Sequence, residues 1–256
     1  MMDYDAELRL QNEALRRACA IGRDEIVVDI GCGTGQTTRE AARAASAGSA
    51  LGIDTSAPMI ARARELARNE GLANARFETG DAQTWSFSPQ SFDIAISRFG
   101  TMFFRDPLTA FVNIRGALKA GGRLVMIVWQ SHAANEWSIA IQQCLAAEAR
   151  SPVTATDALD PFSLADPRAV ERLLAAAGFA GTTLREVHEP VYYGDSVESA
   201  FEWIGGFLGT REILQGLDVR DAERARERLR ETLAKHRRVD GVWFDSRAWL
   251  ITAHRP

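Results

Sequence analysis

The chain has 256 residues, with few cysteines, no excess of basic residues and no long apolar run. Its three cysteines, Cys19, Cys32 and Cys144, lie far apart and show no Cys-x-x-Cys or Cys/His spacing, which argues against a disulfide framework and a zinc site. No stretch approaches the roughly 18 apolar residues of a membrane span, and the acidic start lacks the apolar core of a secretory signal. We therefore expect reduced thiols, a cytoplasmic location and no membrane partner.

The charge balance also argues against nucleic acid. A formal net charge of −4 lacks the basic footprint of a dedicated nucleic-acid binder. Residues 220–238 are rich in arginine, but Glu223, Glu227 and Glu231 are interleaved, which is typical of a solvated helix with ion pairs between successive turns. No cluster of carboxylates and histidines indicates a catalytic metal. We expect neither a nucleic-acid partner nor a metal.

The order of apolar runs predicts the fold class. In the first half, short apolar runs alternate with helical patterns, which predicts βαβ units and a parallel sheet. The expected strands are residues 25–30, 50–54, 76–79, 91–97, 123–129, 183–188 and 247–254. The expected helices follow the first strand to about residue 47 and then span 56–71, 107–118, 137–150, 166–178, 197–208 and 221–237.

A glycine-rich turn follows the first expected strand. Its residues Gly31, Gly33 and Gly35 permit a tight bend, a close approach of a ligand to the backbone, and entry into a helix whose N-terminal amides face the site. By itself this turn fits any adenosine cofactor, or none.

Acidic residues at the ends of the next two strands narrow the choice. Asp54 ends the second strand, where a carboxylate can accept both hydroxyls of a ribose, and Asp81 follows the third strand. Either aspartate alone fits a turn or a helix cap. Their recurrence along the carboxyl edge of one parallel sheet, where ligands bind in such folds, instead indicates an adenosine-containing ligand.

Two cofactor classes compete for this layout. The glycine spacing is G-x-G-x-G, whereas the dinucleotide fingerprint is G-x-G-x-x-G. Asp29 lies just before the turn, where it would repel a pyrophosphate but suit a cofactor with an ammonium and a sulfonium group. Asp81 has no role in the common dinucleotide pattern. These features favour S-adenosylmethionine over a nicotinamide dinucleotide.

The ordered segments Val27 to Gly35 (VVDIGCGTG), Gly52 to Ser56 (GIDTS) and Gly80 to Gln83 (GDAQ) resemble the class I S-adenosylmethionine-dependent methyltransferases. The resemblance implies a Rossmann-like α/β fold, with a seven-stranded, mostly parallel sheet whose last strand is antiparallel and with helices on both faces. We expect a single domain over residues 1–256, with a core at about 20–130, 166–189 and 243–256. Helical insertions at about 131–165 and 190–240 leave from the carboxyl ends of parallel strands, so we expect them to form a lid over the acceptor or, alternatively, an oligomer interface.

The resemblance also assigns a role to each segment of the site. The glycine turn lies against the methionine and ribose, Asp54 binds the ribose hydroxyls, and Asp81 meets the adenine amino group. Residues after the fourth strand line the methionine end. Arg98, where the family often has a small residue, either pairs with Asp29 or Asp93 or holds the cofactor carboxylate or an anionic substrate. The expected cofactor-binding residues are Asp29, Gly31, Cys32, Gly33, Gly35, Gln36, Thr37, Asp54, Thr55, Met59, Asp81, Ala82, Gln83, Ser97, Arg98 and Phe99.

The acceptor is expected to be a small organic molecule methylated by in-line displacement, where the protein positions the acceptor and, for a hydroxyl, removes a proton. His132 is the preferred candidate base over His188 and His236, although a lone histidine is commonly structural. Nucleobase amines are disfavoured, because residues 97–100 lack an Asn/Asp-Pro-Pro-aromatic run. The expected substrate-binding residues are Trp129, Asn135, Trp137, Tyr192 and Trp243, although aromatic residues are by default core residues.

The sequence thus predicts a methyltransferase that converts S-adenosylmethionine to S-adenosylhomocysteine and acts as a monomer or homodimer. An NAD(P)-dependent oxidoreductase and a non-catalytic S-adenosylmethionine-binding protein remain as alternatives.

Overall fold

The computed structural model describes residues 4–146 and 160–256, and the chain divides into two compact units. The sheet unit comprises residues 11–130, 159–187 and 248–256. The smaller unit comprises residues 1–10, 131–158 and 188–247. The predicted domain bounds and the predicted lid function of the insertions stay predictions.

The sheet unit is built on a seven-stranded sheet in the order β3-β2-β1-β4-β5-β10-β6. The strands β1 to β5 run parallel, and β10 pairs with β5 in antiparallel register, as predicted. Buried aliphatic residues fill the central strands, because both faces of such a sheet are covered. The bounds are β1 Ile26–Ile30, β2 Ser49–Asp54, β3 Ala75–Thr79, β4 Phe92–Arg98, β5 Leu118–Trp129, β6 Ala180–His188 and β10 Arg247–His254.

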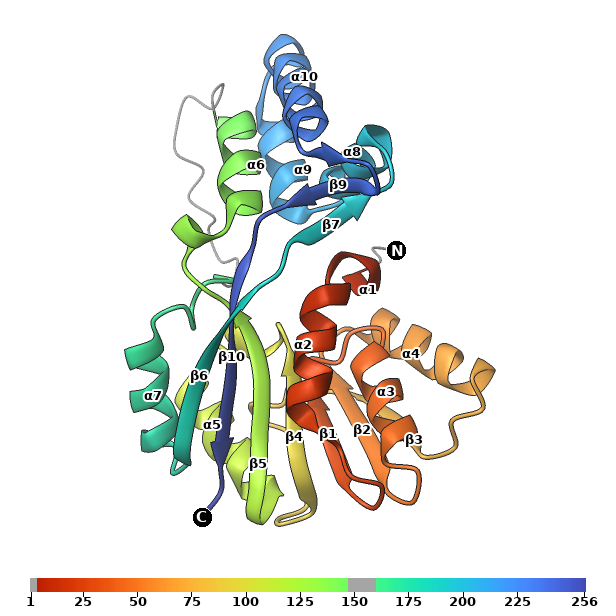
Figure 1. Cartoon of the computed structure of the whole chain (residues 1–256), viewed down its shortest axis with the longest axis vertical. Coiled ribbons are helices and arrows are strands. Elements are labelled where there is room, and N and C mark those ends of the chain that lie inside the picture. The colour runs from red at the N-terminus through yellow and green to blue at the C-terminus, as the bar shows by residue number, and fades with distance from the viewer. Residues whose placement is uncertain (1–3, 147–159) are drawn as a thin grey trace. The chain divides into compact units, whose positions relative to one another are not determined.

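Helices connect these strands and cover the sheet. In Figure 1, α2 and α3 lie in front of the sheet and α5 lies behind it. Ser56, Asp106 and Asp166 cap three of the helices, each followed by a proline in the first turn, and the starts at Ser56 and Asp166 were predicted from this pattern. The bounds are α2 Arg9–Cys19, α3 Gln36–Ala44, α4 Ala57–Asn69, α5 Pro107–Ala117 and α7 Pro167–Ala176, with a 3₁₀ turn η1 at Thr101–Phe103.

The smaller unit contains the helices α1 (Tyr4–Glu7), α6 (Glu136–Ala146), α8 (Val197–Gly205), α9 (Leu208–Gly216) and α10 (Val219–Lys235), and the 3₁₀ turn η2 (His132–Ala134). Three of these helices were predicted, although the end of the helix predicted over 137–150 lies outside the described residues. The helices α1 and α9 and the small sheet β7-β9-β8 were not predicted. The strands of that sheet are β7 Val191–Gly194, β8 Arg237–Arg238 and β9 Gly241–Phe244.

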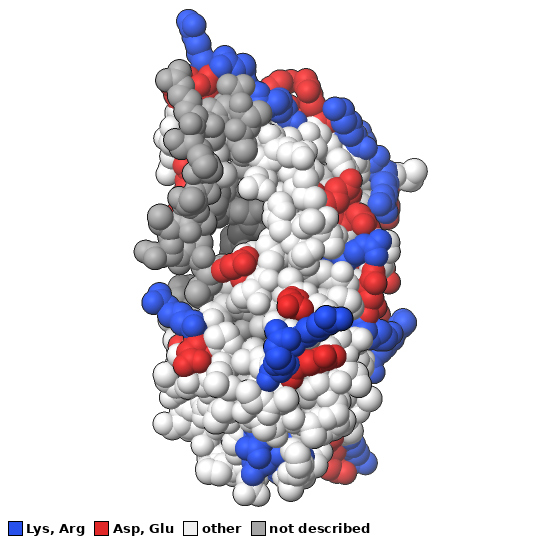
Figure 2. Space-filling model, turned by 90° about the vertical axis from the view of Figure 1, so that its left-hand side faces the viewer, with Lys and Arg blue, Asp and Glu red and all other residues white. Residues whose placement is uncertain are grey.

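The arginine-rich segment forms α10, as predicted. It buries small and aliphatic residues on one side, Ala222, Ala225, Leu229 and Leu233, and pairs Arg226 with Glu223 one turn away. On the face of the molecule drawn in Figure 2, acidic and basic side chains are interspersed. Among the helices of the described residues, none has the length and apolar character needed to cross a bilayer.

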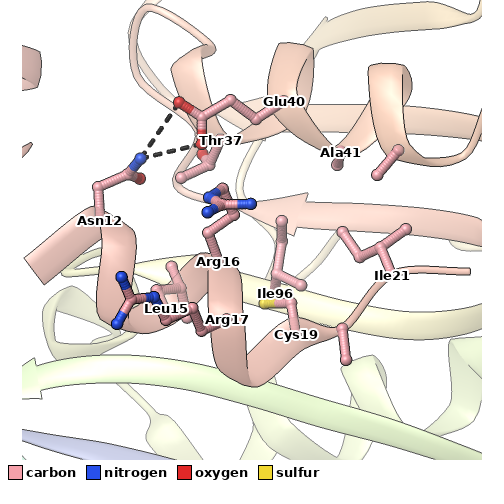
Figure 3. Close-up of a pocket in the computed structure, with 12 residues that line it drawn as sticks. Asn12, Leu15, Arg16, Arg17, Cys19, Ile21, Thr37, Glu40, Ala41 and Ile96 are labelled. Atoms are coloured by element: carbon pink, nitrogen blue, oxygen red, sulfur yellow. Dashed lines mark hydrogen bonds between the residues drawn. The ribbon is translucent and has the colours of Figure 1, made fainter.

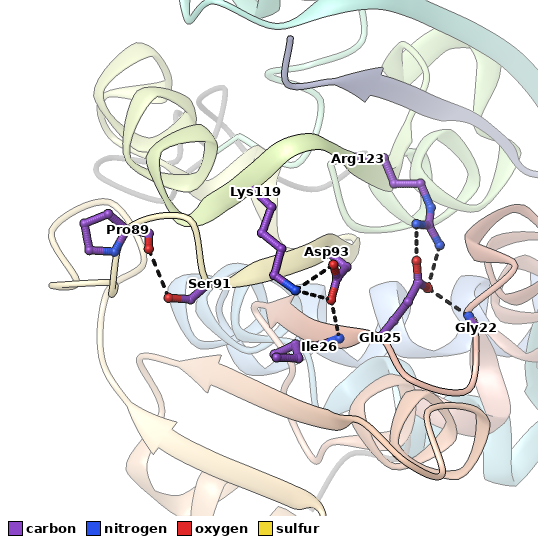
Figure 4. A network of polar contacts seen from close by, with 8 residues as sticks. All are labelled: Gly22, Glu25, Ile26, Pro89, Ser91, Asp93, Lys119 and Arg123. Carbon is purple, nitrogen blue, oxygen red and sulfur yellow. Dashed lines mark hydrogen bonds and ion pairs between the residues drawn. The ribbon is translucent and has the colours of Figure 1, made fainter.

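The edge of the sheet where β1 and β4 begin is held by ion pairs (Figure 4). Arg123 donates to both carboxylate oxygens of Glu25 at 2.6 and 2.9 Å, and this bond lowers the pKa of Glu25. Lys119 donates to Asp93, which also accepts the backbone N–H of Ile26 at 2.8 Å. These contacts fix the amino edge of the sheet, so the carboxyl edge remains for a ligand.

Candidate cofactor site

The glycine turn connects β1 to α3 with three left-handed residues. Gly31, Gly33 and Gly35 have φ angles of +69°, +54° and +80°. A Cβ on Gly31 would lie 2.8 Å from the Gly100 backbone, and one on Gly35 would lie 2.4 Å from the Phe77 ring. A Cβ on Gly33 would meet only the Met59 sulfur, at 3.8 Å. Packing therefore requires the outer two glycines, while the middle one leaves open space where a ligand can approach the backbone.

Asp29 lies behind this turn and is completely buried. The Thr37 and Thr38 hydroxyls donate to its Oδ2 at 2.5 and 2.6 Å, while its Oδ1 is buried and without a hydrogen-bond partner. Burial raises the pKa of Asp29 to about 6, against the two threonine hydrogen bonds and the charge of Arg98, which lower it. Because buried polar atoms are normally hydrogen-bonded, this oxygen can accept a donor from a ligand at the site.

Cys32, inside the turn, is not a reactive thiol. Burial, together with the charges of Asp29 and Asp54, raises the pKa of its thiol, so the sulfur stays protonated at neutral pH. Burial likewise raises the pKa of Cys19 to about 12. All three cysteines of the chain are free and buried.

Asp54 lies at the end of β2, facing the turn. Its Oδ2 accepts the backbone N–H of Gly33 at 2.9 Å and its Oδ1 accepts that of Ser56 at 2.8 Å. Each carboxylate oxygen has a second lone pair, so both can still accept a ribose hydroxyl. Thr55 beside it is exposed, and Met59 on α4 is half-buried near Gly33.

The loop after β3 carries the predicted adenine contacts. Asp81 is exposed, and its Oδ1 accepts the backbone N–H of Gln83 at 2.9 Å. Asn113 on α5 donates to the carbonyl oxygens of Ala82 and Trp85, both at 2.9 Å. Gln83 is held in turn by the backbone N–H of Asp106. The loop is therefore fixed in place, with the Asp81 side chain toward solvent.

The end of β4 lies beside the glycine turn. Ser97 is buried, and its hydroxyl donates to the Ile30 carbonyl oxygen at 2.7 Å, which joins the ends of β1 and β4. Phe99 has a φ angle of +54°, which is unfavourable for a residue with a Cβ. Its ring stacks on the Trp129 ring, with the two ring centroids 3.9 Å apart. Trp129, predicted to bind substrate, is buried against this ring.

One of the predicted partners of Arg98 is wrong. Asp93 lies at the beginning of β4 and Arg98 at its end, and Asp93 is bound by Lys119 and Ile26 at the opposite edge of the sheet (Figure 4). Arg98 Nη1 instead donates to Gln36 Oε1 at 2.5 Å and to Asn12 Oδ1 at 3.1 Å. Its charge reaches Asp29, where it lowers the pKa. Arg98 is therefore placed at the carboxyl edge, as a cofactor contact requires.

The other residues predicted to act on the acceptor belong to the smaller unit. His132 begins η2 and is half-buried. Asn135 is buried, and its Oδ1 accepts from Trp137 Nε1 at 3.2 Å and from the backbone N–H of Arg247 at 3.0 Å. The roles of His132, Asn135 and Trp137 toward an acceptor stay predictions.

Two aromatic residues of that prediction pair across the small sheet. Tyr192 and Trp243 are opposite each other in register, with ring centroids 5.0 Å apart. The Arg9 guanidinium lies over both rings, at 4.1 and 4.4 Å. Sequence reasoning missed Arg9, because its position beside these rings depends on tertiary contacts.

The two other candidate bases, His188 and His236, each contact a carboxylate within the smaller unit. His188 Nε2 lies 2.6 Å from Asp245 Oδ1. His236 lies 3.1 Å from Glu136 and stacks on Phe244, and its second ring nitrogen contacts the Thr232 carbonyl oxygen. Both nitrogens of His236 are thus engaged, which fits a structural role.

The residues at the carboxyl edge fit S-adenosylmethionine. The buried Asp29 Oδ1 lacks a donor that an ammonium group can supply, and Arg98 places a cation near it for a carboxylate. The open side of Gly33 and the Asp54 carboxylate suit a ribose that lies against the turn. The pattern matches a zwitterionic amino acid joined to a nucleoside.

Comparison with known proteins agrees with this reading. Residues 27–122 match the family described as "Methyltransferase domain". Trans-aconitate 2-methyltransferase of Deinococcus radiodurans is 30% identical over 238 residues, which cover 90% of this chain and 86% of the relative. YcgJ of Bacillus subtilis has a similar fold, with a TM-score of 0.65 and 18% identity over 95% of this chain and 97% of that one.

A second solved structure of this fold contains the cofactor. It is phosphoethanolamine N-methyltransferase 2 of Haemonchus contortus in complex with S-adenosyl-L-methionine, with a TM-score of 0.59 and 20% identity. The match covers 96% of this chain and 52% of that one. With the match over most of the chain to the Deinococcus enzyme, the protein belongs to the class I S-adenosylmethionine-dependent methyltransferases and transfers a methyl group to a small molecule.

Proposed function

We propose that the acceptor is a small organic acid and that the methyl group is added to one of its carboxylate oxygens. The proposal is supported by the similarity over 90% of the chain to an enzyme named for trans-aconitate, a small polycarboxylate. It places the enzyme in the cytoplasm, where small organic acids are available and its three free thiols stay reduced.

The reaction is a single displacement. When bound, S-adenosylmethionine supplies a methyl group activated by its sulfonium sulfur. A carboxylate lone pair forms the new O–C bond as the C–S bond breaks, and the electron pair of that bond stays on sulfur. Because a carboxyl group has a pKa near 4, the acceptor is already an anion at neutral pH and needs no base.

In this proposal, residues of the sheet unit bind and orient the cofactor. Asp29 and Arg98 hold the amino-acid end of the cofactor, Asp54 the ribose and Asp81 the adenine. The observation that carries this assignment is the buried Asp29 Oδ1, which has no hydrogen-bond partner and lies within the field of Arg98.

Arg9 is a cation of the smaller unit that can bind the carboxylate of an acidic acceptor. Arg9 is exposed, its guanidinium carbon lies 4.1 and 4.4 Å from the centroids of the Tyr192 and Trp243 rings, and the group donates to the Ala6 carbonyl oxygen at 3.4 Å. The planar guanidinium has N–H groups in a geometry that matches a carboxylate, which can accept two of them at once. Arg9→Gln is expected to raise the KM for the acid while the affinity for S-adenosylhomocysteine stays unchanged.

A methylation assay tests the acceptor class. The full chain is incubated with S-adenosylmethionine and, separately, trans-aconitate, a dicarboxylate, a catechol and a primary amine, and products are identified by mass spectrometry. The expected product is a methyl ester that releases methanol in alkali. Methylation of the catechol or amine alone, with an alkali-stable product, would overturn the proposal.

A further inference from the structure

The side chain of Asn12 connects helix α2 to the end of β4. Asn12 is 6% exposed, and its Oδ1 accepts from Arg98 Nη1 at 3.1 Å. The same Nη1 donates to Gln36 Oε1, so one guanidinium nitrogen of Arg98 is bound by the amide oxygens of Asn12 on α2 and Gln36 on α3. Two acceptors on one nitrogen restrain both the position and the plane of that group.

Glu40 fixes the orientation of the Asn12 amide. Asn12 Nδ2 donates to both carboxylate oxygens of Glu40, at 3.2 and 2.9 Å, across a pocket between α2 and α3 (Figure 3). Because a carboxylate accepts and never donates, it selects the nitrogen of the amide and turns the oxygen toward Arg98. The contacts therefore run in a fixed order from Glu40 through Asn12 to Arg98.

The charge on Glu40 strengthens this arrangement without contacting Arg98. A carboxylate polarises the amide that donates to it, and the amide oxygen then becomes a better acceptor for the guanidinium. The contribution grows because Asn12 is buried, away from competing water. The amide direction that Glu40 selects is also the one that presents the Asn12 oxygen to the Arg98 cation.

We infer that Asn12, oriented by Glu40, is a positioning residue that sets the Arg98 guanidinium for the carboxylate of the cofactor's amino-acid end. The inference rests on the assignment of Arg98 to that carboxylate in the proposed function. It gives helix α2, which lies outside the glycine turn and the acidic strand ends, a part in cofactor recognition.

Comparing the binding of two ligands distinguishes a residue that positions Arg98 from a residue that only stabilises the fold. S-adenosylhomocysteine and 5′-methylthioadenosine share the adenine, ribose and thioether, but only the first carries an amino-acid end. The dissociation constants of both are measured by calorimetry for the full-length chain and its variants. A residue that acts through Arg98 changes the ratio of the two affinities, whereas a merely structural residue changes both alike.

Asn12→Leu keeps the side-chain size and removes the acceptor. It is expected to weaken S-adenosylhomocysteine binding by about three- to tenfold, the effect of one lost hydrogen bond, and to leave methylthioadenosine binding unchanged. Asn74→Leu is the matched control, because Asn74 is also an amide bound to backbone carbonyls, at 2.8 Å from Ala42 and 2.9 Å from Ala45. It is expected to lower the Tm without changing the affinity ratio.

Glu40→Ala provides a second variant that keeps Asn12 and frees its amide to rotate. Glu40 is half-buried at the helix surface, so this variant is expected to fold even where Asn12→Leu does not. It is expected to lower the affinity ratio in the same direction as Asn12→Leu, by a smaller factor. An unchanged ratio in Glu40→Ala contradicts the orienting role of Glu40.

Arg98→Met distinguishes failure of this inference from failure of the proposed function. If Arg98→Met leaves the affinity ratio at the wild-type value, the assignment of Arg98 to the carboxylate is wrong, and this inference is lost with it. If Arg98→Met lowers the ratio while Asn12→Leu does not, only the positioning role is overturned. The expected result is that both lower the ratio and that adding Asn12→Leu to Arg98→Met has no further effect.

Discussion

The backbone N–H of Gly33 donates to Asp54 Oδ2 at 2.9 Å, so the middle glycine of the turn and the acid at the end of β2 are joined directly. One carboxylate thereby shapes the turn and remains able to accept ribose hydroxyls. The two functions are coupled, because a change at Asp54 alters both the ribose contact and the turn that supports it.

Asp54→Ala is expected to weaken S-adenosylhomocysteine binding by roughly 1–3 kcal/mol, through loss of the ribose hydrogen bonds and of the Gly33 contact. The measurement is titration calorimetry. Glu65→Ala, which removes an exposed carboxylate on α4 paired with Arg62, is the control and should bind as the wild type does. An affinity for Asp54→Ala equal to that of Glu65→Ala would remove Asp54 from the site.

Alanine substitutions at two glycines distinguish the effect of backbone strain on stability from the effect of a methyl group on ligand binding. Gly33 and Gly71 both have left-handed backbones, with φ angles of +54° and +69°, and a Cβ on Gly71 meets nothing within 4 Å. Alanine at either position is expected to cost roughly 1–2 kcal/mol of unfolding free energy. Gly33→Ala should also weaken S-adenosylhomocysteine binding, since its methyl group enters the open side of the turn.

Thermal unfolding and calorimetry on both alanine variants check this expectation. Gly71→Ala should lose stability and keep the wild-type affinity. If both variants bind S-adenosylhomocysteine alike, the ligand does not approach the turn at Gly33.

The parts of the site that are local in sequence were the ones that sequence reasoning predicted. The glycine turn, Asp29 before it and the acid after the second strand all follow from short patterns next to a strand. The seven strands of the main sheet and the antiparallel direction of the last one were also predicted, from the apolar runs and the family pattern together. These signals need no knowledge of distant contacts.

The contribution of α2 was not predictable in the same way. Its buried side carries Gln11 and Asn12 beside Leu15 and Cys19, so polar residues interrupt the apolar periodicity that marks a helix. The partner of Asn12, Arg98, lies 86 residues further along the chain. Only the folded arrangement brings the two together, just as it places Lys119, not Arg98, beside Asp93.

His132 tests whether the reaction uses a base. With a carboxylate acceptor, His132→Ala is expected to change kcat by less than about threefold, whereas loss of a general base costs about a hundredfold or more. Steady-state kinetics with saturating S-adenosylmethionine measure this. His254→Ala, at the exposed end of β10, is the control. A hundredfold loss in His132→Ala alone would indicate an acceptor that must be deprotonated.

We expect Asp29 to lower the stability of the ligand-free protein at neutral pH and to strengthen the binding of the cofactor. Burial raises its pKa to about 6 in the folded chain, above the ordinary 3.8, although the Thr37 and Thr38 hydroxyls and the Arg98 charge oppose the shift and the Asp54 charge adds to it. The folded state therefore binds the proton more tightly than the unfolded state. As pH rises from about 4 to about 6 this group's contribution to stability falls, and the loss is complete above pH 6.

Asp29→Asn removes that loss. It is expected to raise the unfolding free energy of the ligand-free protein at pH 7.5 by about 1–3 kcal/mol, the value of a shift of roughly two pKa units. Denaturant unfolding at pH 7.5 measures the gain, which should shrink at pH 4.5 because wild-type Asp29 is then protonated too. A variant less stable than the wild type at pH 7.5 would mean that the ionised carboxylate is well solvated in the fold.

The same substitution should weaken the binding of a cationic ammonium group. S-adenosylhomocysteine affinity is expected to fall by about tenfold in Asp29→Asn, as a charge-assisted hydrogen bond is lost, while methylthioadenosine affinity stays constant. In the wild type, S-adenosylhomocysteine binding should strengthen as pH rises through about 6, where Asp29 ionises, and this dependence should vanish in the variant. If both ligands respond alike, Asp29 supports the turn and does not contact the ammonium group, and its unpartnered oxygen then requires another occupant.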